Sequence, residues 1–561
     1  MNLRVKFKNM PLTNFLPGKS SRVPLLLLAL LVLTVIALRW RLLGVPLERD
    51  EGEYAYMAQL LLDGTPLYAE AYNMKFPGIY FLYALVIGVF GQTHVSIHVG
   101  LLLLNTISII LLYYLGKSIV DEWTGLVSAA SFAVLSLSYH VDGFWANAEH
   151  FVLPFGLGGL LALRYSSGPN STRLLIVSGI LLGCATLVKQ HGALYGLAGL
   201  LYLVYTGMTS DRRASKEILK NVLTYGAAAA IPFLLALLYL LSAGVFERFF
   251  FWTFTYAREY SSQTSFAEAI NHFTSTLLPL VKTTLLVWLL ALTGLASLVW
   301  FDRTKKEAFF LVCFALCGFV STMPGFYFRS HYYVLFLPAV ALLSGSGSRW
   351  LFLLFAKAEQ RVLRILPPAL VTALALVTSI TSSSDVLFVH SLDQVTRITF
   401  GGNPFSESFP IVEFIKARTD RTDRIGIIGS EPQIFFYSQR RSATGYIYMY
   451  SLLEDQPYAL RMQEEMIQQL ESAQPRLLLY FNVRPSLSEH QRRQERIFDW
   501  FAEYSAKHYD LVARLEYTPG ANSLVFLTER QALLQEPRQV YWITIFEKKS
   551  NPPPSSPKAT L

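Results

Sequence analysis

Long apolar segments separated by short polar ones fill residues 23–382. A helix needs about 20 predominantly apolar residues to cross a bilayer, so we predict a spanning helix wherever an apolar segment approaches this length. Eleven segments do so, at residues 23–38, 94–116, 123–138, 148–163, 174–189, 192–208, 221–242, 276–300, 308–323, 331–348 and 365–382. A further apolar segment, Pro77 to Phe90, is too short to span. The pattern predicts a multi-pass α-helical membrane protein.

The distribution of lysine and arginine decides how these segments are oriented. If Pro77 to Phe90 lies flat on the outer surface, the predicted cytoplasmic segments carry 19 basic residues and the outer segments eight. Counting it as a span would place the basic loops outside, against the positive-inside rule. We therefore expect about eleven spans, a basic cytoplasmic N-terminus (residues 1–22) and a first outer loop (residues 44–93) that contains interfacial helices.

The pattern changes at about residue 383, where short segments with the composition of strands begin. We expect strands at residues 424–430, 476–482, 511–517 and 523–529, and helices at residues 457–473 and 489–508. This is the pattern of a small α/β domain (residues 383–547), which an odd number of spans places outside the cytoplasm. Residues 548–561 are rich in proline and poor in apolar residues, so we expect a disordered tail.

Composition narrows the class of protein further. Hydrophobic residues make up 53% of the chain and charged residues 16%, against roughly 25% charged in an average soluble domain. The formal net charge of +9 is accounted for by the predicted cytoplasmic loops, so we expect a lipid bilayer and no nucleic acid as a partner. The three cysteines lie in apolar segments without CxxC spacing, and we expect neither a disulfide nor a zinc site.

Candidate catalytic residues lie in the first outer loop. Asp50 and Glu51 directly follow the first span, and Tyr54 opens an apolar stripe with helical spacing that would lie along the interface. A carboxylate that is partly shielded from water there can have a raised pKa and act as a general base toward a hydroxyl. The alternative is that the two acids only complement the dipole of a helix N-terminus.

The rest of this loop carries a resemblance to a known family. A Gly-x-x-x-Tyr turn (Gly64 to Tyr68) and Lys75-Phe-Pro77 follow the Asp-Glu pair. The loop closely resembles that of membrane glycosyltransferases with the GT-C fold, in particular the protein O-mannosyltransferase and aminoarabinose transferase group (glycosyltransferase family 39-like). That group has Lys-Pro-Pro at the second motif, so Phe76 departs from its pattern. Weaker similarity covers residues 147–149, 189–190 and 326–345, and the resemblance reaches about residue 380.

The resemblance implies an activity. It implies a GT-C membrane enzyme that transfers a sugar from a polyprenyl-phosphate donor to an acceptor hydroxyl, with inversion, on the outer face of the plasma (inner) membrane. Asp50 would be the catalytic base, and Glu51 would assist it or bind the acceptor. The sugar, which could be a hexose, a pentose or an aminosugar, stays open, as does the acceptor, which could be a lipid, a glycan or a protein.

The remaining candidate residues serve the leaving group and the acceptor. Cations at headgroup level would stabilise the departing phosphate, and the candidates are Lys75, Lys189, Arg329 and His331. Tyr54, Tyr68 and Glu149 are candidates for contacts with the acceptor or the sugar. Asp50 and Glu149 could also hold a divalent metal ion, and no other cofactor is expected.

Other functions remain open at this level. A lipid or glycan transporter or flippase could use the outer charges as an entry site, and a non-catalytic envelope assembly protein could use the α/β domain to bind a partner. The predicted spans contain almost no ionisable residue apart from Lys282, which counts against coupled transport. For Lys189 the structural alternative is a lysine that snorkels at a helix end, and for Arg329 and His331 it is an ordinary outer loop.

Overall fold

The computed structural model describes residues 22–166, 171–209, 215–300, 305–356, 358–487, 496–521 and 524–549. The expected basic N-terminus and most of the expected tail lie outside these residues. The chain divides into two compact units. Unit 1 comprises residues 1–45, 75–246 and 261–392, and unit 2 comprises residues 46–74, 247–260 and 393–561.

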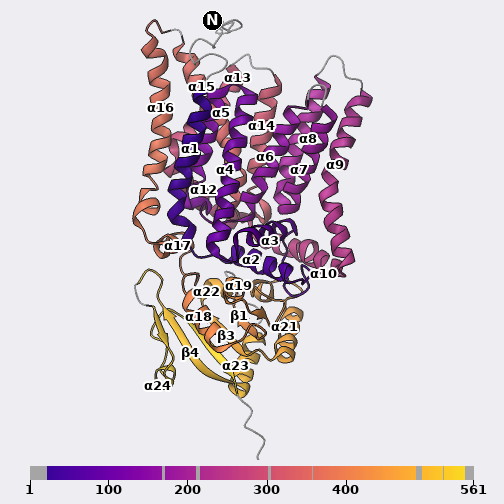
Figure 1. Cartoon of the computed structure of the whole chain (residues 1–561), viewed down its shortest axis with the longest axis vertical. Helices are drawn as coiled ribbons and strands as arrows, with labels where there is room; N and C mark the ends of the chain where they lie inside the picture. The colour runs from indigo at the N-terminus through magenta and orange to yellow at the C-terminus, as the bar shows by residue number, and fades with distance from the viewer. Residues whose placement is uncertain are drawn as a thin grey trace, which may run out of the picture. The chain divides into compact units, whose positions relative to one another are not determined.

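Unit 1 is a bundle of helices, most of which run side by side (Figure 1). Its longer helices are α1 (Val23–Trp40), α3 (Gly78–Phe90), α4 (His94–Ile119), α5 (Glu122–Leu135), α6 (Ala148–Arg164), α7 (Ser171–Val188), α8 (Ala193–Met208), α9 (Ser215–Ser242), α12 (Phe266–Thr283), α13 (Leu285–Trp300), α14 (Lys305–Val320), α15 (Leu337–Phe355) and α16 (Arg361–Thr381). Short 3-10 turns connect several of them, including η3 (Tyr139–Val141), η4 (Gln190–Gly192) and η7 (Ser330–Leu335).

Small residues allow the helices of this bundle to approach closely. A Cβ atom at Gly294 of α13 would lie 1.9 Å from the carbonyl oxygen of Leu343, and one at Gly347 of α15 would lie 1.9 Å from that of Leu290. Without a hydrophobic driving force between helices in lipid, close backbone contact of this kind is a main source of helix association. The α13–α15 contact is therefore a place where larger side chains cannot be accommodated.

All eleven apolar segments contain helix, but their lengths differ from the prediction. Among the described residues, six helices are long and apolar enough to cross a membrane, or up to seven if the bent pair α12 and α13 is one span. Helices α5, α6, α8 and α14 have fewer than 18 residues. The count of eleven spans is thus not established by helix length and stays a prediction.

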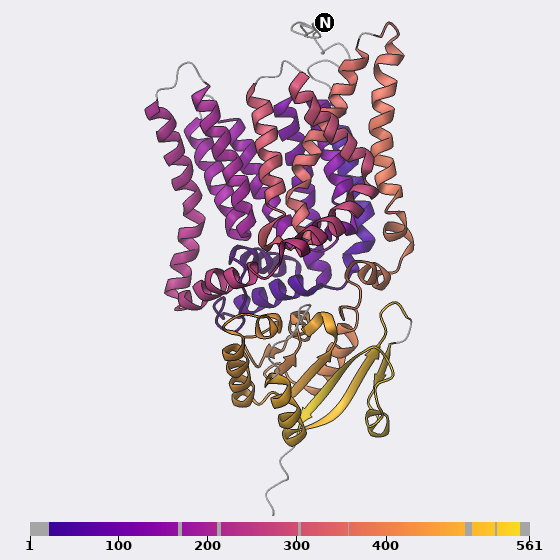
Figure 2. The ribbon, with the colours of Figure 1, turned by 180° about the vertical axis from the view of Figure 1, so that it is seen from behind.

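Two expected helices are corrected. Residues 276–300 do not form one continuous helix, because the chain bends by 97° between α12 and α13. Thr284 leaves the helical conformation there, with φ −126° and ψ 29°, and Pro279 removes a backbone donor in the preceding turn. The helix expected at residues 331–348 begins later, at Leu337, because the first residues of that segment form the 3-10 turn η7. The bend between α12 and α13 is visible in Figure 2, where α12 runs across the lower part of the bundle.

The short apolar segment forms a helix of its own, as expected. Helix α3 (Gly78–Phe90) has 13 residues and is among the apolar helices too short to be counted as a span. A Cβ atom at Gly78 would lie 2.5 Å from the carbonyl oxygen of Leu187, so the start of α3 is packed directly against the last turn of α7. Its orientation relative to a bilayer remains a prediction.

Unit 2 contains the predicted α/β structure. Its six-stranded sheet has the order β2-β1-β3-β6-β4-β5, with β1 parallel to β2 and β3 and the other pairs antiparallel. The strands are β1 (Arg424–Ile428), β2 (Arg441–Ser442), β3 (Leu477–Asn482), β4 (Tyr509–Tyr517), β5 (Val525–Leu527) and β6 (Tyr541–Lys548). The principal helices are α17 (Leu392–Phe400), α18 (Ser408–Arg418), α19 (Pro432–Ser438), α20 (Tyr450–Leu453), α21 (Ala459–Ala473) and α23 (Arg496–His508).

All four predicted strands are present, but β6 was not predicted although it lies in the middle of the sheet. It pairs with both β3 and β4, which are separated by 26 residues of sequence. Its last residue, Lys548, donates its backbone N–H to the carbonyl of Arg476 at 3.0 Å. Residue 548 therefore belongs to the sheet, and the expected start of the disordered tail there is wrong.

Part of the first loop groups with the α/β structure, which differs from the expected domain boundaries. Helix α2 (Arg49–Leu62) packs on α19, and a Cβ atom at Gly52 would lie 2.6 Å from the backbone nitrogen of Gln433. The ring of Tyr56 lies 5.1 Å from that of Phe435, and its hydroxyl accepts the N–H of Ser442 at 2.8 Å. These contacts join the Asp-Glu helix to residues that lie almost 400 positions later.

Candidate functional site

The N-terminus of α2 is fixed by a capping box. The carboxylate of Glu48 accepts the backbone N–H of Asp50 at 2.9 Å and that of Glu51 at 3.0 Å, and Glu51 Oε2 accepts the N–H of Glu48 at 3.1 Å. Three backbone N–H groups that the helix itself leaves unsatisfied are thereby paired. Glu51 is fully buried. One of its oxygens therefore has a structural role, which agrees with the helix-terminus alternative for this residue.

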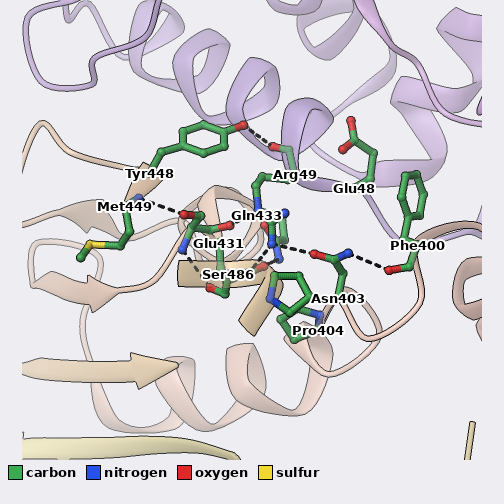
Figure 3. Close-up of polar contacts among 12 residues, drawn as sticks. Glu48, Arg49, Phe400, Asn403, Pro404, Glu431, Gln433, Tyr448, Met449 and Ser486 are labelled. Carbon is green, nitrogen blue, oxygen red and sulfur yellow. Dashed lines mark hydrogen bonds and ion pairs between the residues drawn. The ribbon is translucent and has the colours of Figure 1, made fainter. Parts of the chain in front are cut away.

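Asp50 has different surroundings. It is half-buried, and two phenols reach its carboxylate: Tyr448 lies 3.2 Å from Oδ1 and Tyr54 lies 3.4 Å from Oδ2. The hydroxyl of Tyr448 also lies 3.0 Å from the carbonyl oxygen of Arg49, as Figure 3 shows, and 3.1 Å from Glu53 Oε2. Unlike Glu51, Asp50 has both side-chain oxygens directed at side-chain groups rather than at the helix backbone.

Arg49 connects this end of α2 to the α/β part of unit 2. Its guanidinium pairs with Glu431 at 2.9 Å and donates to the side-chain oxygen of Asn403 at 2.8 Å, as the close-up shows (Figure 3). Glu431 is fully buried, and Gln433 donates to it from the first turn of α19 at 2.6 Å. A buried carboxylate with two donors, one of them charged, holds the start of α2 in one position.

Tyr68, a further candidate from the first loop, packs within unit 2. It is fully buried and has a positive φ of 65°, which is uncommon for a residue with a side chain. Its ring lies 5.4 Å from that of Phe249 in an edge-on arrangement, and Arg248 donates to the adjacent carbonyl of Ala69 at 2.7 Å. The structure thus places Tyr68 in a packed part of unit 2, beside Phe249.

Unit 1 brings together several of the other candidates. Glu149, near the start of α6, forms a buried ion pair with Lys189, which precedes η4. The Lys189 ammonium also lies 4.6 Å from the centre of the Tyr332 ring, a cation–π distance. His331 Nδ1, on the same turn η7, lies 3.3 Å from a carboxylate oxygen of Asp142. Glu149, Lys189 and His331 thus form one polar cluster, with Asp142 as a member that was not predicted.

This cluster contains buried polar atoms without a partner. Glu149 Oε2, both ring nitrogens of His150 and both side-chain amide atoms of Asn147 have no hydrogen-bond partner among the described residues. All three residues are almost fully buried at the beginning of α6. Leaving such groups unpaired costs roughly 1–3 kcal/mol each, so we expect them to be paired by water or by a bound polar ligand.

The last two candidate cations have less defined surroundings. The Arg329 guanidinium lies 5.1 Å from the centre of the Tyr327 ring, immediately before η7. Lys75 is half-buried and is the first residue of the second segment of unit 1, just before α3. The expected convergence of Lys75, Lys189 and Arg329 on one headgroup stays a prediction.

A metal site finds little support in the donor groups. Among the described residues there is no group of three or more His, Cys, Asp or Glu side chains that could hold a metal ion. Glu149 already has an ammonium group against one oxygen, which disfavours a second cation beside it. Asp50 lies in unit 2 and Glu149 in unit 1.

The positioning residues of α2 were missed by sequence reasoning. In the sequence Arg49 is one of the eight basic residues of the predicted outer segments, and Tyr448 and Glu431 lie in the predicted α/β domain, for which no site residue is predicted. Tyr448 stands in the aromatic segment Tyr446 to Tyr450, an unusual composition for a small soluble domain. That composition is the only sequence signal that could have drawn attention to it.

Comparison with known structures identifies the fold. The chain has the fold of membrane glycosyltransferases of the GT-C type, so the resemblance inferred from the first outer loop is confirmed. It is similar to ArnT from Cupriavidus metallidurans bound to undecaprenyl phosphate, with a TM-score of 0.54 and 14% identity over 88% of this chain and 97% of that one. It is also similar to the Archaeoglobus fulgidus oligosaccharyltransferase tethered with an acceptor peptide, with a TM-score of 0.54 and 11% identity over 91% of this chain and 75% of that one.

Comparison of the sequence with protein families agrees with the structural comparison. Residues 74–239 match the family of dolichyl-phosphate-mannose-protein mannosyltransferases. The matched segment begins at the junction of the two units and covers α3 to α9 almost completely, including Glu149 and Lys189. A search of the curated proteins gives no match.

Proposed function

We propose that this protein is an integral membrane glycosyltransferase that moves a sugar from a polyprenyl-phosphate donor to an acceptor hydroxyl. The observation that carries the proposal is the Asp50 carboxylate, held at the start of α2 by phenols in a chain with the GT-C fold. The ArnT structure with undecaprenyl phosphate supports a lipid-linked donor. The match to mannosyltransferases supports transfer of a sugar.

The proposed reaction is a single displacement. Asp50 accepts the proton of the acceptor hydroxyl while that oxygen forms a bond to the anomeric carbon. The bond between the anomeric carbon and the phosphate oxygen breaks, and its electron pair leaves with the polyprenyl phosphate. One displacement inverts the configuration at the anomeric carbon. Holding Asp50 in position increases the reaction rate, because a base that is already oriented avoids an entropy cost at the transition state.

The cations of unit 1 are assigned to the leaving group. Negative charge grows on the bridging phosphate oxygen as the sugar departs, and Lys75, Lys189, Arg329 and His331 would stabilise it. Lys189 is held by Glu149, so one of its three donors is committed and the others are available for a phosphate oxygen. The unpartnered Glu149 Oε2 and the His150 ring are suited to hydroxyl groups of the sugar or the acceptor.

Location and substrate identity belong to the same proposal. We place the enzyme in the plasma (inner) membrane with about eleven spans and with Asp50 and the α/β part on the extracytoplasmic side. Activated nucleotide sugars are confined to the cytoplasm, so an outward-facing enzyme needs its sugar on a lipid. Hexosyl and pentosyl donors share the phosphate contacts, and the acceptor is a hydroxyl of a lipid, a glycan or a protein.

A transfer assay tests the proposal. The purified protein in lipid nanodiscs would be incubated with a radiolabelled donor, which is a hexose, a pentose or an aminosugar linked to polyprenyl phosphate. The acceptors offered would be membrane lipids, glycan lipids and peptides that contain Ser or Thr. We expect label to move to one acceptor class, and NMR of the product to show an inverted anomeric configuration. Retained configuration would contradict the single displacement. Lipid-linked sugar movement across sealed vesicles without any transfer would favour the flippase alternative.

A further inference from the structure

We propose that Tyr448 is a positioning residue that holds the Asp50 carboxylate and sets the pH range in which Asp50 works as a base. This inference rests on the proposed function of Asp50 and adds to it a residue from the α/β part of unit 2. Tyr448 stands 398 residues after Asp50 in the sequence. The α/β part would then be a component of the catalytic apparatus and not only an appended domain.

The contacts of the phenol carry the proposal. Its oxygen lies within hydrogen-bonding distance of three acceptors, which are the Arg49 carbonyl at 3.0 Å, Glu53 Oε2 at 3.1 Å and Asp50 Oδ1 at 3.2 Å. Figure 3 draws the first of these contacts, between Tyr448 and Arg49. A tyrosine has a single O–H hydrogen and can donate to one of them at a time. Asp50 and Glu53 therefore compete for one donor.

The segment that carries Tyr448 is fixed to the sheet, so the phenol does not have to be ordered for each turnover. The backbone N–H of Met449 donates to Ser430 Oγ at 2.9 Å, and Ser430 stands two residues after the end of β1. Tyr450 donates its hydroxyl to the carbonyl of Pro485 at 2.6 Å. Tyr446 donates to Glu465 on α21 at 2.8 Å. Neighbours on both sides of Tyr448 are thus held by different elements.

The phenol stays a hydrogen-bond donor. Burial raises the pKa of Tyr448 well above its ordinary value, and the nearby carboxylates of Glu53 and Asp50 raise it further. The neutral phenol is therefore the stable form at physiological pH. A donor that pairs with a carboxylate favours its charged form, whereas a second carboxylate nearby disfavours it.

Two opposing influences on Asp50 follow from this arrangement. Tyr448 and Tyr54 stabilise the Asp50 anion, while Glu53 repels it and takes the Tyr448 hydrogen part of the time. Among the described residues, the contacts also place Glu48 in the helix cap, and Arg49 with Glu431 in their ion pair, at this end of α2. The titratable phenol of Tyr450 lies beside them, with its ring 5.4 Å from the Arg49 guanidinium. Removing Tyr448 and removing the Glu53 charge should therefore move the titration of Asp50 in opposite directions.

Two substitutions test this competition. Tyr448→Phe keeps the ring and removes the donor, and we expect kcat/KM to fall about tenfold at the pH optimum and its acid limb to move to higher pH. Glu53→Gln removes the competing charge, and we expect the acid limb to move to lower pH. Tyr509→Phe is the matched control, because it removes a buried phenol hydrogen bond, donated to the carbonyl of Pro475 at 2.9 Å, from a part of unit 2 that does not hold Tyr448. It should leave the acid limb in place.

A readout that is independent of turnover separates this inference from the proposed function. The protonation of Asp50 would be followed by infrared pH titration of the purified protein, with the Asp50→Asn variant identifying the band. Opposite shifts of this band in Tyr448→Phe and Glu53→Gln support the positioning role even if no acceptor for transfer has been found. Unchanged titration of Asp50 in Tyr448→Phe would overturn it, and so would shifts of the same sign in both variants. A wild-type enzyme without transferase activity would count against the proposed function only.

Discussion

At the scale of single residues, the two acids of the Asp-Glu pair have separate roles. Glu51 closes the capping box with Glu48, whereas the oxygens of Asp50 face the phenols of Tyr448 and Tyr54. Adjacent residues on a helix point about 100° apart, so one of the pair can stabilise the helix while the other faces the site. This separation is the reason for assigning the base to Asp50.

We predict that Asp50→Asn lowers kcat by a factor of about 10² to 10⁴, the usual cost of losing a general base. Folding and donor binding should stay nearly intact, because the amide fills the same space. Single-turnover transfer and a donor-binding titration measure the two effects separately. Asp63→Asn is the control, since it changes an exposed acid at the other end of the same helix and should keep full activity. A largely active Asp50→Asn variant would move the role of base to Glu51 or Glu149.

We predict that Arg329→Ala lowers kcat and kcat/KM together, because the charge on the departing phosphate is greatest in the transition state. Arg329→Lys should restore only part of the rate, since a lysine lacks the planar two-donor fork of arginine. Steady-state kinetics with varied donor concentration measure both parameters, and Arg421→Ala serves as a control that removes an exposed arginine from unit 2. A higher KM for the donor with unchanged kcat would instead indicate a uniform binding contact.

At the scale of secondary-structure elements, the packing of α2 on α19 positions the Asp-Glu pair. The contact depends on the absence of a side chain at Gly52, where an added Cβ atom would lie 2.6 Å from a backbone nitrogen. Glycine inside a helix normally destabilises it by about 1 kcal/mol relative to alanine. Its use at this position is explained by the close approach of the two helices.

We predict that Gly52→Ala destabilises the protein by about 1–3 kcal/mol, because the gain in helix propensity is smaller than the cost of forcing α2 away from α19. Transferase activity should fall as well, since Asp50 moves with the helix. Thermal unfolding in detergent and the transfer assay measure the two effects. Gly226→Ala in α9 is the matched control: nothing lies within 4 Å of its added Cβ atom, and we expect equal or higher stability. Equal behaviour of the two variants would show that the α2–α19 contact is not tight.

At the scale of the whole molecule, the orientation of the helices determines on which side of the membrane the reaction occurs. Helix length alone supports six or seven spans among the described residues. The distribution of basic residues instead supports eleven, with 19 basic residues in the cytoplasmic segments and eight in the outer ones. The difference between seven and eleven spans comes from four shorter helices, which are α5, α6, α8 and α14. Each of them has fewer than 18 residues.

We predict that a reporter fused after Asp211 is active in the cytoplasm and that one fused after Ser383 is active outside it. Green fluorescent protein and alkaline phosphatase would each be fused at both positions. The two reporters give opposite signals on the two sides of the membrane, so the fusion at one position is the control for the fusion at the other. A cytoplasmic signal after Ser383 would contradict both the odd number of spans and the placement of α3 flat on the outer surface.

The sequence alone determined the elements whose signal is local. Hydrophobic segments gave the positions of the helices in unit 1, and alternation of residue types gave four of the strands in unit 2, because these patterns reflect burial of neighbouring residues along one element. The Asp-Glu pair and the turns that follow it were sufficient to recognise the GT-C fold. The break between α12 and α13 was not predicted, although Pro279, Lys282 and Thr284 interrupt the apolar segment there, because a few such residues also occur in helices that continue.

Only the tertiary structure decided which distant residues meet. The contact of Tyr448 with Asp50, the pairing of Arg49 with Glu431 and the ion pair of Glu149 with Lys189 join residues that are 398, 382 and 40 positions apart. Likewise, β6 lies in the middle of the sheet through pairing with strands on both sides. No single segment encodes such a contact, because it depends on how whole elements pack. For that reason the sequence could indicate the candidate base, while the residues that hold it became visible only in the folded chain.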